Sequence, residues 1–599
     1  MLNLKLSSIL YLVLIMVLCQ TGCGGGSGQS SSQTSTDPVG NTYSKTAPVL
    51  FFSDLVWGPK TGWEGSTTKG AAVTIWGKDF GNAAASSKVT VNGTDIMSTN
   101  SSYIAEWNAT GPARNLSRIT FWIPSSATTG NGTISVTVNG ASSNSLPFNV
   151  TTGVIYFVAV SDGSNSYNGL YATRTGHTGN DGPFKDLWKF NPCGSNDSAH
   201  TPGSCNPSQD GQYIVYVRGG TYTAQDTTGD STLIALRGPY GGSSKQKALI
   251  GYPAETVTVD TASAGRGIIW IAAYDPYGFV DYLTLSKIVG VNGYAPFTTF
   301  GSYTRVIGCT FHEYLEYIQS GIIQVMDSKH TALYGNYLNH NGYNGSTSDQ
   351  GSMKHGFYIK TESSISSGDR STTYTDVGWN EFSNFVANDY HGGVIFVSKS
   401  GDADISGFPT AFTYIHDNYF HNNAQECLYV GDGVPIGDVY FYNNICANNN
   451  SINGGMTFYN GTTNVYVFNN TFYQVAGAGY EILGTGSGTN VLFENNIWFG
   501  TTGSQFLYWE GSTGAVFSSD HDLYYSPSSA PTPTGYGVNI SYNLNGDPLF
   551  ISNGSDFHLT SSSPAISAGT SNVSSVVKND YDGIVRPQGS AYDIGVYEY

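Results

Sequence analysis

Charged residues are scarce in this sequence. They make up 11% of its 599 residues, against about 25% in an ordinary soluble protein. The 43 Asp and Glu outnumber the 25 Lys and Arg, which gives a formal net charge of −18. This balance argues against a nucleic-acid partner, because phosphate binding needs clustered Lys and Arg. It is compatible with bound calcium.

Helical patterns are missing as well, since no long apolar run with a 3.6-residue period follows the N-terminal segment. Gly is abundant instead, with 75 residues, far above its usual share of about 7%. The chain also has 42 Tyr. A polar, uncharged and turn-rich composition of this kind is typical of extracellular all-β proteins, and we therefore expect an all-β fold.

The first residues have the pattern of an export signal. Lys5 supplies a positive start, and residues 9–19 form an apolar run that is too short to span a bilayer. The small residue before Cys23 resembles a bacterial lipoprotein cleavage site, although Gln20 stands where an aliphatic residue is usual. The resemblance implies a signal peptide over residues 1–22 and a lipid on Cys23.

Residues 23–45 are rich in Gly, Ser, Gln and Thr and are predicted to be a flexible linker. A lipidated cysteine before such a linker would anchor the chain to a membrane leaflet. The expected location is therefore the outer membrane or cell surface, with plain secretion as the alternative.

Five cysteines remain in the rest of the chain. Cys193 and Cys205 flank a short loop and are candidates for a disulfide in an exported protein. Cys309, Cys427 and Cys446 fall within apolar strand patterns, so we expect them to be buried small hydrophobic residues.

Residues 46–152 form one predicted unit. Alternating apolar and polar runs with Gly-bearing turns indicate about seven short strands, which favours a β-sandwich. The stretches "VTIWGKDFG" and "VTVNG" resemble the TIG family of immunoglobulin-like domains. In exported bacterial proteins, that resemblance implies a spacer or a carbohydrate-side module.

An asparagine recurs at a fixed distance further along the chain. Asn418, Asn444, Asn470 and Asn496 are 26 residues apart, and Asp522 follows after another 26. A fixed short period predicts units that stack, with strands about 4.8 Å apart. Asn suits the bend of each unit because it tolerates left-handed backbone angles, and stacked Asn side chains bond to neighbouring units. A propeller is disfavoured, because its blades need about 40 to 50 residues.

Earlier residues follow the same pattern less closely. Asn336, Cys309 and Tyr282 are spaced 27 residues apart, whereas Asn336 to Asn380 is 44 residues and Asn380 to Asn418 is 38. The excess is predicted to leave the stack as loops, and insertions of this kind often form a binding face. The predicted loops contain "NGYNGSTSDQGSMK", "TESSISSGDRSTTYTD" and "SKSGDADISGFPT".

The region after the sandwich also carries a resemblance. "VIYFVAVSDGSNSYNG", "NDGPFKDLWKF" and "DGQYIVYVRGGTYT" resemble the entrance of right-handed parallel β-helices such as family nine pectate lyases. This implies a right-handed parallel β-helix of about ten to twelve coils over residues 153–545. Residues 546–599 resemble a tail found after exported bacterial β-helices and are predicted to cap the last coil. Asp580, Asp582 and Asp593 of the tail are candidates for calcium ligands or turn caps.

Candidate functional residues gather beside the long loops. His355 and His391 each precede a Gly at the start of an apolar run, and Lys360 and Lys399 end those runs. If the runs are equivalent strands of neighbouring coils, the two imidazoles lie about 4.8 Å apart. Arg370 follows in the adjoining insertion, so five cationic or titratable side chains are expected to form a catalytic cluster. A structural role for the His residues at a bend is the alternative.

Two reactions would use such a cluster. A polysaccharide lyase needs a base, here a Lys or His, and a cation that neutralises a uronic-acid carboxylate. Arg370 is one candidate cation, and calcium held by Asp402 and Asp404 is the other. A glycoside hydrolase needs two carboxyls, for which Asp402 or Asp404 would pair with Glu426 or Asp432 of the next coil.

The sequence thus indicates a cell-surface, carbohydrate-active protein with polysaccharide as its partner, and the best-fitting activity is that of a lyase on acidic polysaccharides. Neither the clustered calcium aspartates of family nine lyases nor the paired aspartates of β-helical polygalacturonases are recognisable. A non-catalytic glycan-binding adhesin or surface-layer lipoprotein is therefore the alternative.

Overall fold

The chain divides into two compact units, Met1–Thr36 and Asp37–Tyr599. All residues described below belong to the second unit. In the described part of the chain, no helix combines the length and apolarity needed to cross a membrane. The computed structural model describes residues 47–190, 212–223, 234–235, 243–260, 269–271, 281–292, 297–312, 321–339, 355–362, 369–385, 393–431, 434–449, 451, 454–459, 464–475, 480–486, 490–500, 505–511, 516–526 and 538–599.

The N-terminal part is a β-sandwich, as its alternating sequence predicts. One sheet has the order β1-β3-β7-β6 and the other β2-β9-β8-β4-β5. Alternate side chains of both sheets, such as Ile75, Phe121 and Val136, enter one shared apolar core. Its elements are β1 (Val49–Ser53), β2 (Trp57–Pro59), η1 (Trp63–Gly65), β3 (Lys69–Lys78), β4 (Lys88–Val91), β5 (Thr94–Met97), β6 (Ile104–Thr110), β7 (Ser117–Pro124), β8 (Gly130–Val138) and β9 (Ala141–Thr151).

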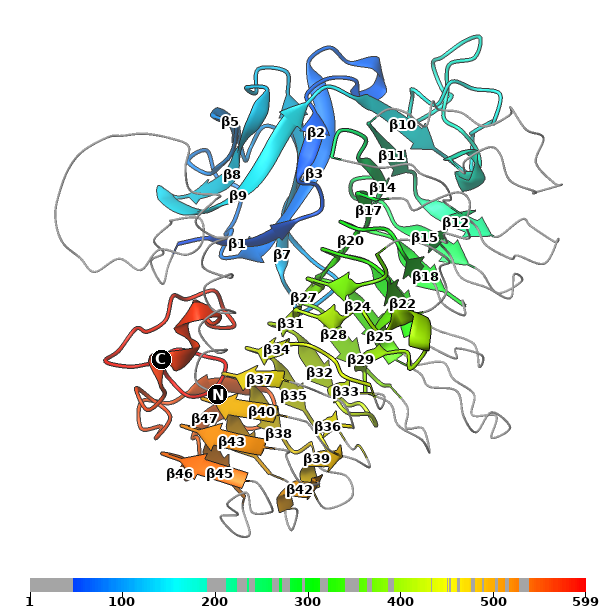
Figure 1. Ribbon diagram of the computed structural model, residues 1–599. Coiled ribbons are helices and arrows are strands. Elements are labelled where there is room, and N and C mark those ends of the chain that lie inside the picture. The colour runs from blue at the N-terminus through cyan, green and yellow to red at the C-terminus, as the bar shows by residue number, and fades with distance from the viewer. Residues whose placement is uncertain are drawn as a thin grey trace. The chain divides into compact units, whose positions relative to one another are not determined.

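The remainder is a parallel β-helix, which confirms the predicted all-β solenoid (Figure 1). Three parallel sheets run along it, and each coil contributes one strand to each sheet in turn. Sheet I contains β10 (Val154–Val158), β11 (Tyr213–Val217), β14 (Lys247–Gly251), β17 (Leu283–Ser286), β20 (Arg305–Ile307), β23 (Ala332–Tyr334), β27 (Asp376–Gly378), β31 (Thr413–His416), β34 (Val439–Tyr442), β37 (Asn464–Phe468), β40 (Asn490–Glu494), β43 (Val516–Asp520) and β45 (Val538–Ser541).

Sheets II and III complete each coil. Sheet II contains β12 (Gly220–Thr223), β15 (Val257–Asp260), β18 (Val289–Val291), β21 (Thr310–His312), β24 (Tyr337–Asn339), β28 (Glu381–Ser383), β32 (Tyr419–His421), β35 (Ile445–Ala447), β38 (Thr471–Tyr473), β41 (Ile497–Phe499), β44 (Leu523–Tyr525) and β46 (Leu544–Asn545). Sheet III contains β13 (Ile234–Ala235), β16 (Ile269–Ile271), β19 (Phe297–Thr299), β22 (Gly321–Met326), β25 (His355–Thr361), β29 (Ile395–Lys399), β33 (Leu428–Val430), β36 (Met456–Phe458), β39 (Tyr480–Gly486) and β42 (Gln505–Gly511).

The repeated asparagines form a single file at the corner between sheets I and II, as predicted. The backbone and side-chain amides of Asn418 both donate to Oδ1 of Asn444, at 3.0 and 2.9 Å. The same two bonds join Asn444 to Asn470 and Asn470 to Asn496. Asn496 donates in turn to Oδ1 of Asp522. Each side chain therefore both donates and accepts between coils, and a fully bonded buried network of this kind fixes the register.

Asn444, Asn470 and Asn496 are each preceded by a second asparagine, which has a different structural role. Asn443, Asn469 and Asn495 have φ of 52°, 51° and 62°, in the left-handed region that Asn tolerates. They turn the chain between the two sheets, and the second Asn then enters the file. This division of roles explains why the sequence repeats two asparagines rather than one.

One sequence expectation about the coils needs correction. Thr284 pairs with Arg305 and Val289 with Thr310, so this coil has 21 residues (305 − 284) and not 27. The position equivalent to Cys309 is therefore Ile288 rather than Tyr282, which lies before β17. Tyr282 instead stacks on Tyr303 at 4.4 Å between ring centroids. In the described residues, sheet I contains 13 strands, sheet II 12 and sheet III ten, which agrees with the prediction of about ten to twelve coils.

The interior of the coils is apolar and holds two of the cysteines in a covalent bond. Cys427 and Cys446 form a disulfide with their Cα atoms 6.4 Å apart. Both are fully buried, as predicted, but the prediction that they are unbonded hydrophobic residues is wrong. Cys309 is buried and free. Cys23, Cys193 and Cys205 lie outside the described residues, so the lipid site and their predicted disulfide stay predictions.

The C-terminal tail packs along the outer face of sheet II and not across the end of the last coil, where it was expected. The tail contains β47 (Phe550–Ser552), β48 (Asp556–Leu559) and η4 (Ser571–Ser575). Its Phe557, Ile594 and Val596 form one apolar cluster with Ile497 and other outward side chains of sheet II. Because this face is apolar, covering it removes more apolar surface from water than covering one strand edge would.

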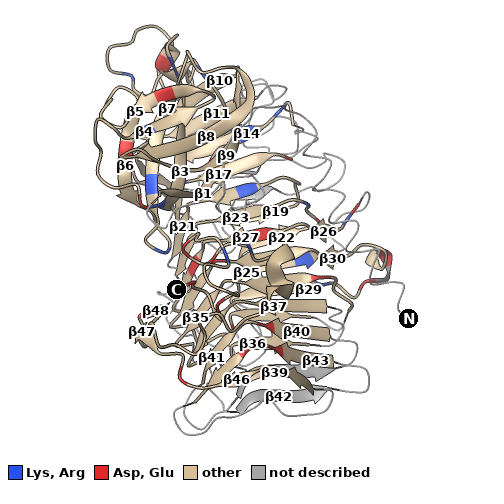
Figure 2. Ribbon diagram, turned by 90° about the vertical axis from the view of Figure 1, so that its left-hand side faces the viewer, with Lys and Arg blue, Asp and Glu red and all other residues tan. Residues whose placement is uncertain are grey.

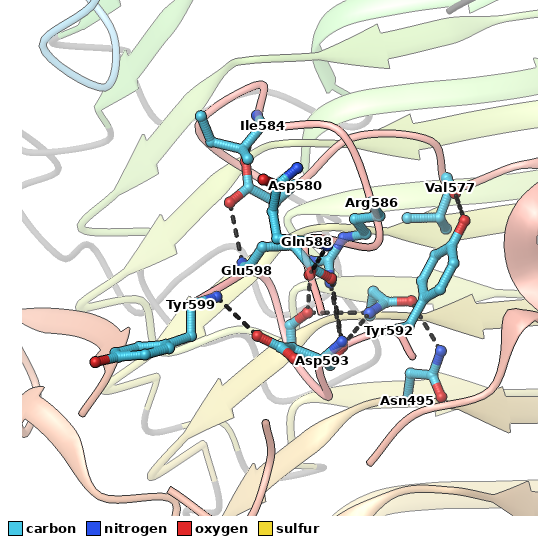
Figure 3. Close-up of polar contacts among 12 residues, drawn as sticks. Asn495, Val577, Asp580, Ile584, Arg586, Gln588, Tyr592, Asp593, Glu598 and Tyr599 are labelled. Atoms are coloured by element: carbon cyan, nitrogen blue, oxygen red, sulfur yellow. Dashed lines mark hydrogen bonds and ion pairs between the residues drawn. The ribbon is translucent and has the colours of Figure 1, made fainter. Parts of the chain in front are cut away.

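Polar groups inside the tail are paired within it (Figure 3). Asp580 accepts backbone hydrogen bonds from Asp582, Ile584 and Glu598. Asp593 accepts them from Ser567 and Tyr599. These two residues therefore cap turns, which was one of the two roles predicted for them. Asp582 instead pairs with Lys78 of the sandwich and His558 of the tail.

One arginine of the sandwich joins it to the solenoid and the tail. The backbone N–H of Arg114 donates to Glu381 at 2.6 Å, and its guanidinium donates to the carbonyls of Asp417 and Tyr581. The guanidinium also lies 3.3 Å from the centre of the Tyr581 ring. These contacts hold three parts of the chain at one point.

Candidate functional site

The longest coils carry their extra residues next to sheet III. The chain leaves β25 and β29 and, before reaching sheet I, forms β26 (Thr372–Thr373), η3 (Ala403–Ile405) and β30 (Thr410–Ala411). β26 and β30 pair with each other in a small parallel sheet outside the coil. The described parts of the insertions after β25 and β29 thus form an added layer at the carboxyl ends of these two strands. The predicted loop over residues 341–354 lies outside the described residues.

The outward face of sheet III carries a row of apolar side chains. Tyr358, Phe396 and Tyr429 occupy matching positions on successive strands, and each is at most 8% exposed. Met326 packs in the same cluster. Since the aromatic faces are covered, this row supports the strands and does not offer a platform for sugar rings.

Charged side chains gather where the row ends, and we call Asp327, Lys360, Glu362, Arg370 and Asp404 the charge cluster. Figure 2 shows acidic and basic segments near one another around β22, β29 and β30, on a solenoid that carries few others. Lys360 Nζ lies 2.8 Å from Glu362 Oε2. The other carboxylate oxygen of Glu362 accepts a hydrogen bond from the Ser400 hydroxyl at 2.8 Å.

Asp327 is the most deeply placed carboxyl of the cluster. It follows β22 directly, is 3% exposed, and accepts a hydrogen bond from the backbone N–H of Glu362 at 2.7 Å. Its second oxygen is buried and has no partner in the structure. Burial raises the pKa of Asp327 to about 7, with a further contribution from the negative charge of Glu362. The carboxyl is therefore half ionised near neutral pH.

The two cations of the cluster remain charged. Burial alone would lower the pKa of Lys360, but the hydroxyl of Tyr358 and the carboxylate of Glu362 raise it above the usual value. Arg370 forms an ion pair with Asp404, whose side chain is 55% exposed. The positive charges of Arg370 and Lys360 both act on Asp327, because each lowers its pKa. The cluster thus combines a titrating carboxyl with two fixed cations.

His355 lies apart from the cluster, at the opposite end of β25. The pairing of Phe357 with Ile395 is a 38-residue step (395 − 357), so the position equivalent to His355 is Gly393. The His355 ring nitrogen Nδ1 indeed lies 2.7 Å from the Gly393 carbonyl oxygen. Burial lowers the pKa of His355 to about 4, so the ring is neutral at pH 7. His391 lies outside the described residues, two positions before the equivalent of His355.

Lys399 does not occupy the position equivalent to Lys360, although the sequence predicted that the two residues end equivalent strands. Lys360 is paired with Ser398, and Lys399 with Thr361. Because side chains alternate along a strand, Lys360 and Lys399 belong to opposite faces of sheet III. Lys399 Nζ donates to the Ser406 carbonyl at 3.3 Å, and burial lowers its pKa. The catalytic roles assigned from the sequence to His355, His391, Lys360, Lys399 and Arg370 stay predictions, but the structure brings only Lys360 and Arg370 into the cluster.

Calcium at Asp402 and Asp404 stays a prediction. Calcium takes about six to eight oxygen ligands, whereas Asp404 is engaged by Arg370. No group of three or more His, Cys, Asp or Glu suited to a metal occurs in the described ranges. The described side chains around Asp402 and Asp404 therefore do not fit the ion.

Sequence reasoning missed Asp327 and the pairing of Glu362 with Lys360. Asp327 is a single acidic residue after an apolar run, and neither its burial nor its neighbours leave a periodic signal. The sequence pointed to the region only indirectly. The two coils with extra residues contain β25 and β29, and the charge cluster lies at the ends of these strands.

No model of a known protein family matches the chain, and no curated protein matches it. Solved structures do resemble it. Pectate lyase Pel9A has a TM-score of 0.39 and 15% identity, covering 74% of this chain and 96% of its own. The catalytic unit of the GH87 α-1,3-glucanase from Streptomyces thermodiastaticus has a TM-score of 0.34 and 10% identity, with 82% and 89% covered. The Yersinia enterocolitica family 28 exopolygalacturonase has a TM-score of 0.37 and 11% identity, with 85% and 98% covered.

Proposed function

We propose that the protein acts on acidic polysaccharides outside the cell and cleaves them by β-elimination at the charge cluster. The observation that carries this proposal is the position of Asp327, a carboxyl with a pKa of about 7, beside the cations Lys360 and Arg370. β-Elimination needs a base for the proton next to a uronic-acid carboxylate and positive charge for the intermediate that forms. The cluster supplies both kinds of group.

Each residue then has a defined role. Asp327, in its ionised form, accepts the proton from C5 next to the carboxylate. The C4–C5 double bond then forms as the glycosidic C4–O bond breaks, and the released oxygen takes up a proton from water. Lys360 and Arg370 neutralise the carboxylate of the sugar, and their charge is retained because the pKa of Lys360 is raised and Arg is always protonated. Glu362 holds Lys360 in place through the 2.8 Å ion pair. The Cys427–Cys446 disulfide supports an extracellular site of action, because such bonds persist in oxidising compartments.

Glycoside hydrolysis is the second candidate, and the neighbouring carboxyls Asp327 and Glu362 favour it. A hydrolase needs one protonated and one ionised carboxyl, and environments that separate two pKa values assign these roles. Asp327 with its raised pKa would be the acid. Glu362, paired with Lys360, would be the ionised partner.

The direct test is incubation of the purified protein with pectate, alginate and glycosaminoglycans. Elimination gives an unsaturated product that absorbs near 235 nm. We expect Asp327→Asn to lower the rate by about 10²- to 10⁴-fold and Lys360→Met by about 10²- to 10³-fold. New reducing ends without the absorbance would indicate hydrolysis. Glycan binding with neither product would identify a non-catalytic adhesin.

Matched variants separate chemistry from folding. Lys88→Met removes a lysine that also forms a surface ion pair, with Asp95 of the sandwich, and the rate should stay unchanged. Asp327→Asn leaves no buried charge behind, so the melting temperature should not fall. If Asp327→Asn and Lys88→Met both retain the full rate, the charge cluster is not the catalytic site.

The pH dependence gives an independent prediction. If Asp327 is the base, kcat/KM rises with pH about tenfold per unit below pH 7 and levels off above it. Glu362→Gln should shift the midpoint to lower pH, because the Glu362 charge raises the pKa of Asp327, and Lys360→Met should shift it to higher pH, because the Lys360 charge lowers it. A rate that instead falls above pH 7 would assign Asp327 as an acid and contradict elimination.

A further inference from the structure

The last coil of the solenoid leaves strand edges on the surface. β45 is the final strand of sheet I and β46 the final strand of sheet II, each with one neighbour in the described residues. Tyr542 between them is 79% exposed and Ile540 is 40% exposed. An exposed edge presents free backbone N–H and C=O groups and is a template for pairing with another strand.

The asparagine file ends at this edge with Asn543. Asn543 Oδ1 accepts from the Asp522 backbone N–H at 2.8 Å, and its side-chain amide donates to Ser519 at 2.7 Å. In the coils before it, the backbone N–H of the file residue donates to the next coil. For Asn543 no further coil follows in the described part of the chain. Its N–H therefore faces the surface where another coil would begin.

Exposed apolar side chains are frequent in this part of the sequence. Of the eleven exposed large hydrophobic side chains in the described residues, five lie between Val516 and Ile551. Besides Ile540 and Tyr542 they include Leu549 at 37% and Ile551 at 60% exposure. Exposed apolar residues that gather in one place mark interaction sites more often than single ones do.

The last strands of sheets I and II are also free of charge. Residues 538–546 contain no Asp, Glu, Lys or Arg, in a chain with a net charge of −18. Edge strands are normally protected from self-association by charged residues or Pro, and β45 has neither. Between two copies of an acidic chain, a contact through these uncharged strands places no like charges on the paired edges.

The opposite end of sheet I is closed. The N–H of Phe157 in β10 donates to the Gly169 carbonyl at 2.8 Å, and its carbonyl accepts from the Phe184 N–H at 2.9 Å. The outer edge of β10 is thus occupied by the chain's own connection. Head-to-tail stacking of copies through sheet I is blocked, whereas two identical C-terminal ends remain free to meet.

We propose that the occupant of this edge is a second copy of the same chain, bound end to end. Two β45 edges related by a two-fold axis pair antiparallel, and both partners use the same surface, which gives a closed dimer and not a fibre. Tyr542 and Ile540 of each copy then cover the other's edge. Because the strands are short, we expect an interface at the small end of the usual range, with a dissociation constant on the order of micromolar.

The test is sedimentation velocity of the full chain over a concentration series, in a Cys23→Ser variant that carries no lipid. We expect the mass to rise from that of one chain to twice that value across the micromolar range. The double variant Ile540→Lys, Tyr542→Lys should raise the dissociation constant at least tenfold, because it places like charges on both edges. Unchanged circular dichroism and melting temperature would show that the fold is intact.

The matched control is Val154→Lys, which adds a lysine at a 41% exposed position on the first strand of sheet I. It should leave the dimer unaffected. A single species of monomer mass throughout the series would overturn the proposal. So would a dimer that survives the double variant, or one that Val154→Lys dissociates, since the contact would then lie elsewhere.

Discussion

Replacing Glu598 by Gln is expected to lower the free energy of unfolding by about 3 to 5 kcal/mol, because the change leaves a buried arginine without its counter-charge. Arg586 and Glu598 have fully buried side chains and are joined at 2.9 Å between Nη1 and Oε1. Glu598 also accepts backbone hydrogen bonds from Gln588 and Asp593 (Figure 3). The pair therefore sits at the centre of the tail that covers sheet II.

The reverse variant should behave differently with pH. Arg586→Met leaves a buried carboxyl, which neutralises by taking up a proton, whereas an arginine cannot lose its charge. In this variant the folded-state pKa of Glu598 lies above its unfolded value, so the proton stabilises the fold at low pH and stability is lost as pH rises. Arg586→Met should thus cost less at pH 5 than at pH 8.

Guanidinium denaturation followed by tyrosine fluorescence measures these changes, and limited proteolysis shows whether the tail undocks first. Glu64→Gln, at an exposed position of the sandwich, is the control and should change stability by less than about 0.5 kcal/mol. If Glu598→Gln lowers the free energy of unfolding by less than about 1 kcal/mol, the ion pair of Arg586 and Glu598 does not hold the tail in place.

Asn444→Ala is expected to cost a similar amount, about 3 to 5 kcal/mol, because it removes the middle of the asparagine file. Oδ1 of Asn444 accepts from the backbone and side-chain amides of Asn418, and its own amide donates to the Ile415 carbonyl at 2.9 Å. Alanine leaves these buried groups without partners, and each orphaned group costs about 1 to 3 kcal/mol.

Asn444→Asp tests the chemistry of the file. Asp522 already occupies a position in it, and burial raises the pKa of that carboxyl to about 7. A protonated Asp at 444 can still donate one hydrogen bond, so the variant should be close to wild type at pH 5 and markedly weaker at pH 8. The control is Asn490→Ala, an exposed Asn on β40. Equal melting temperatures for Asn444→Ala and Asn490→Ala would contradict a stabilising role for the file.

The sequence was sufficient to predict the solenoid, because a stack of coils imposes its period on the chain. Asn418, Asn444, Asn470 and Asn496 had to recur at equal distance to reach one another. Tyr282 was misplaced because a large residue before a strand satisfies the same spacing by chance, and only strand pairing reveals the 21-residue coil.

The candidate site was less predictable, because it depends on register to a single residue. Lys360 and Lys399 are 39 residues apart, and the true step between their strands is 38. That difference of one moves Lys399 to the other face of the sheet. Asp327 gave no signal at all, since its pKa is set by burial and by Glu362, and both depend on the fold.

The asparagine file also determines where the chain can grow. In sheet I, successive register positions 284, 305, 332, 376, 414, 440, 466, 492, 518 and 539 are separated by between 21 and 44 residues. Yet the paired position in sheet II always follows five residues later, at 289, 310, 337, 381, 419, 445, 471, 497, 523 and 544. In the first coils, the positions that pair with this series are 214 and 248 in sheet I and 221 and 258 in sheet II, seven and ten residues apart. From β17 onward the corner admits no insertion, so every gain in length there is directed to the two flanks of sheet III. New specificities would therefore arise there by lengthening loops, while the opposite corner keeps the scaffold constant.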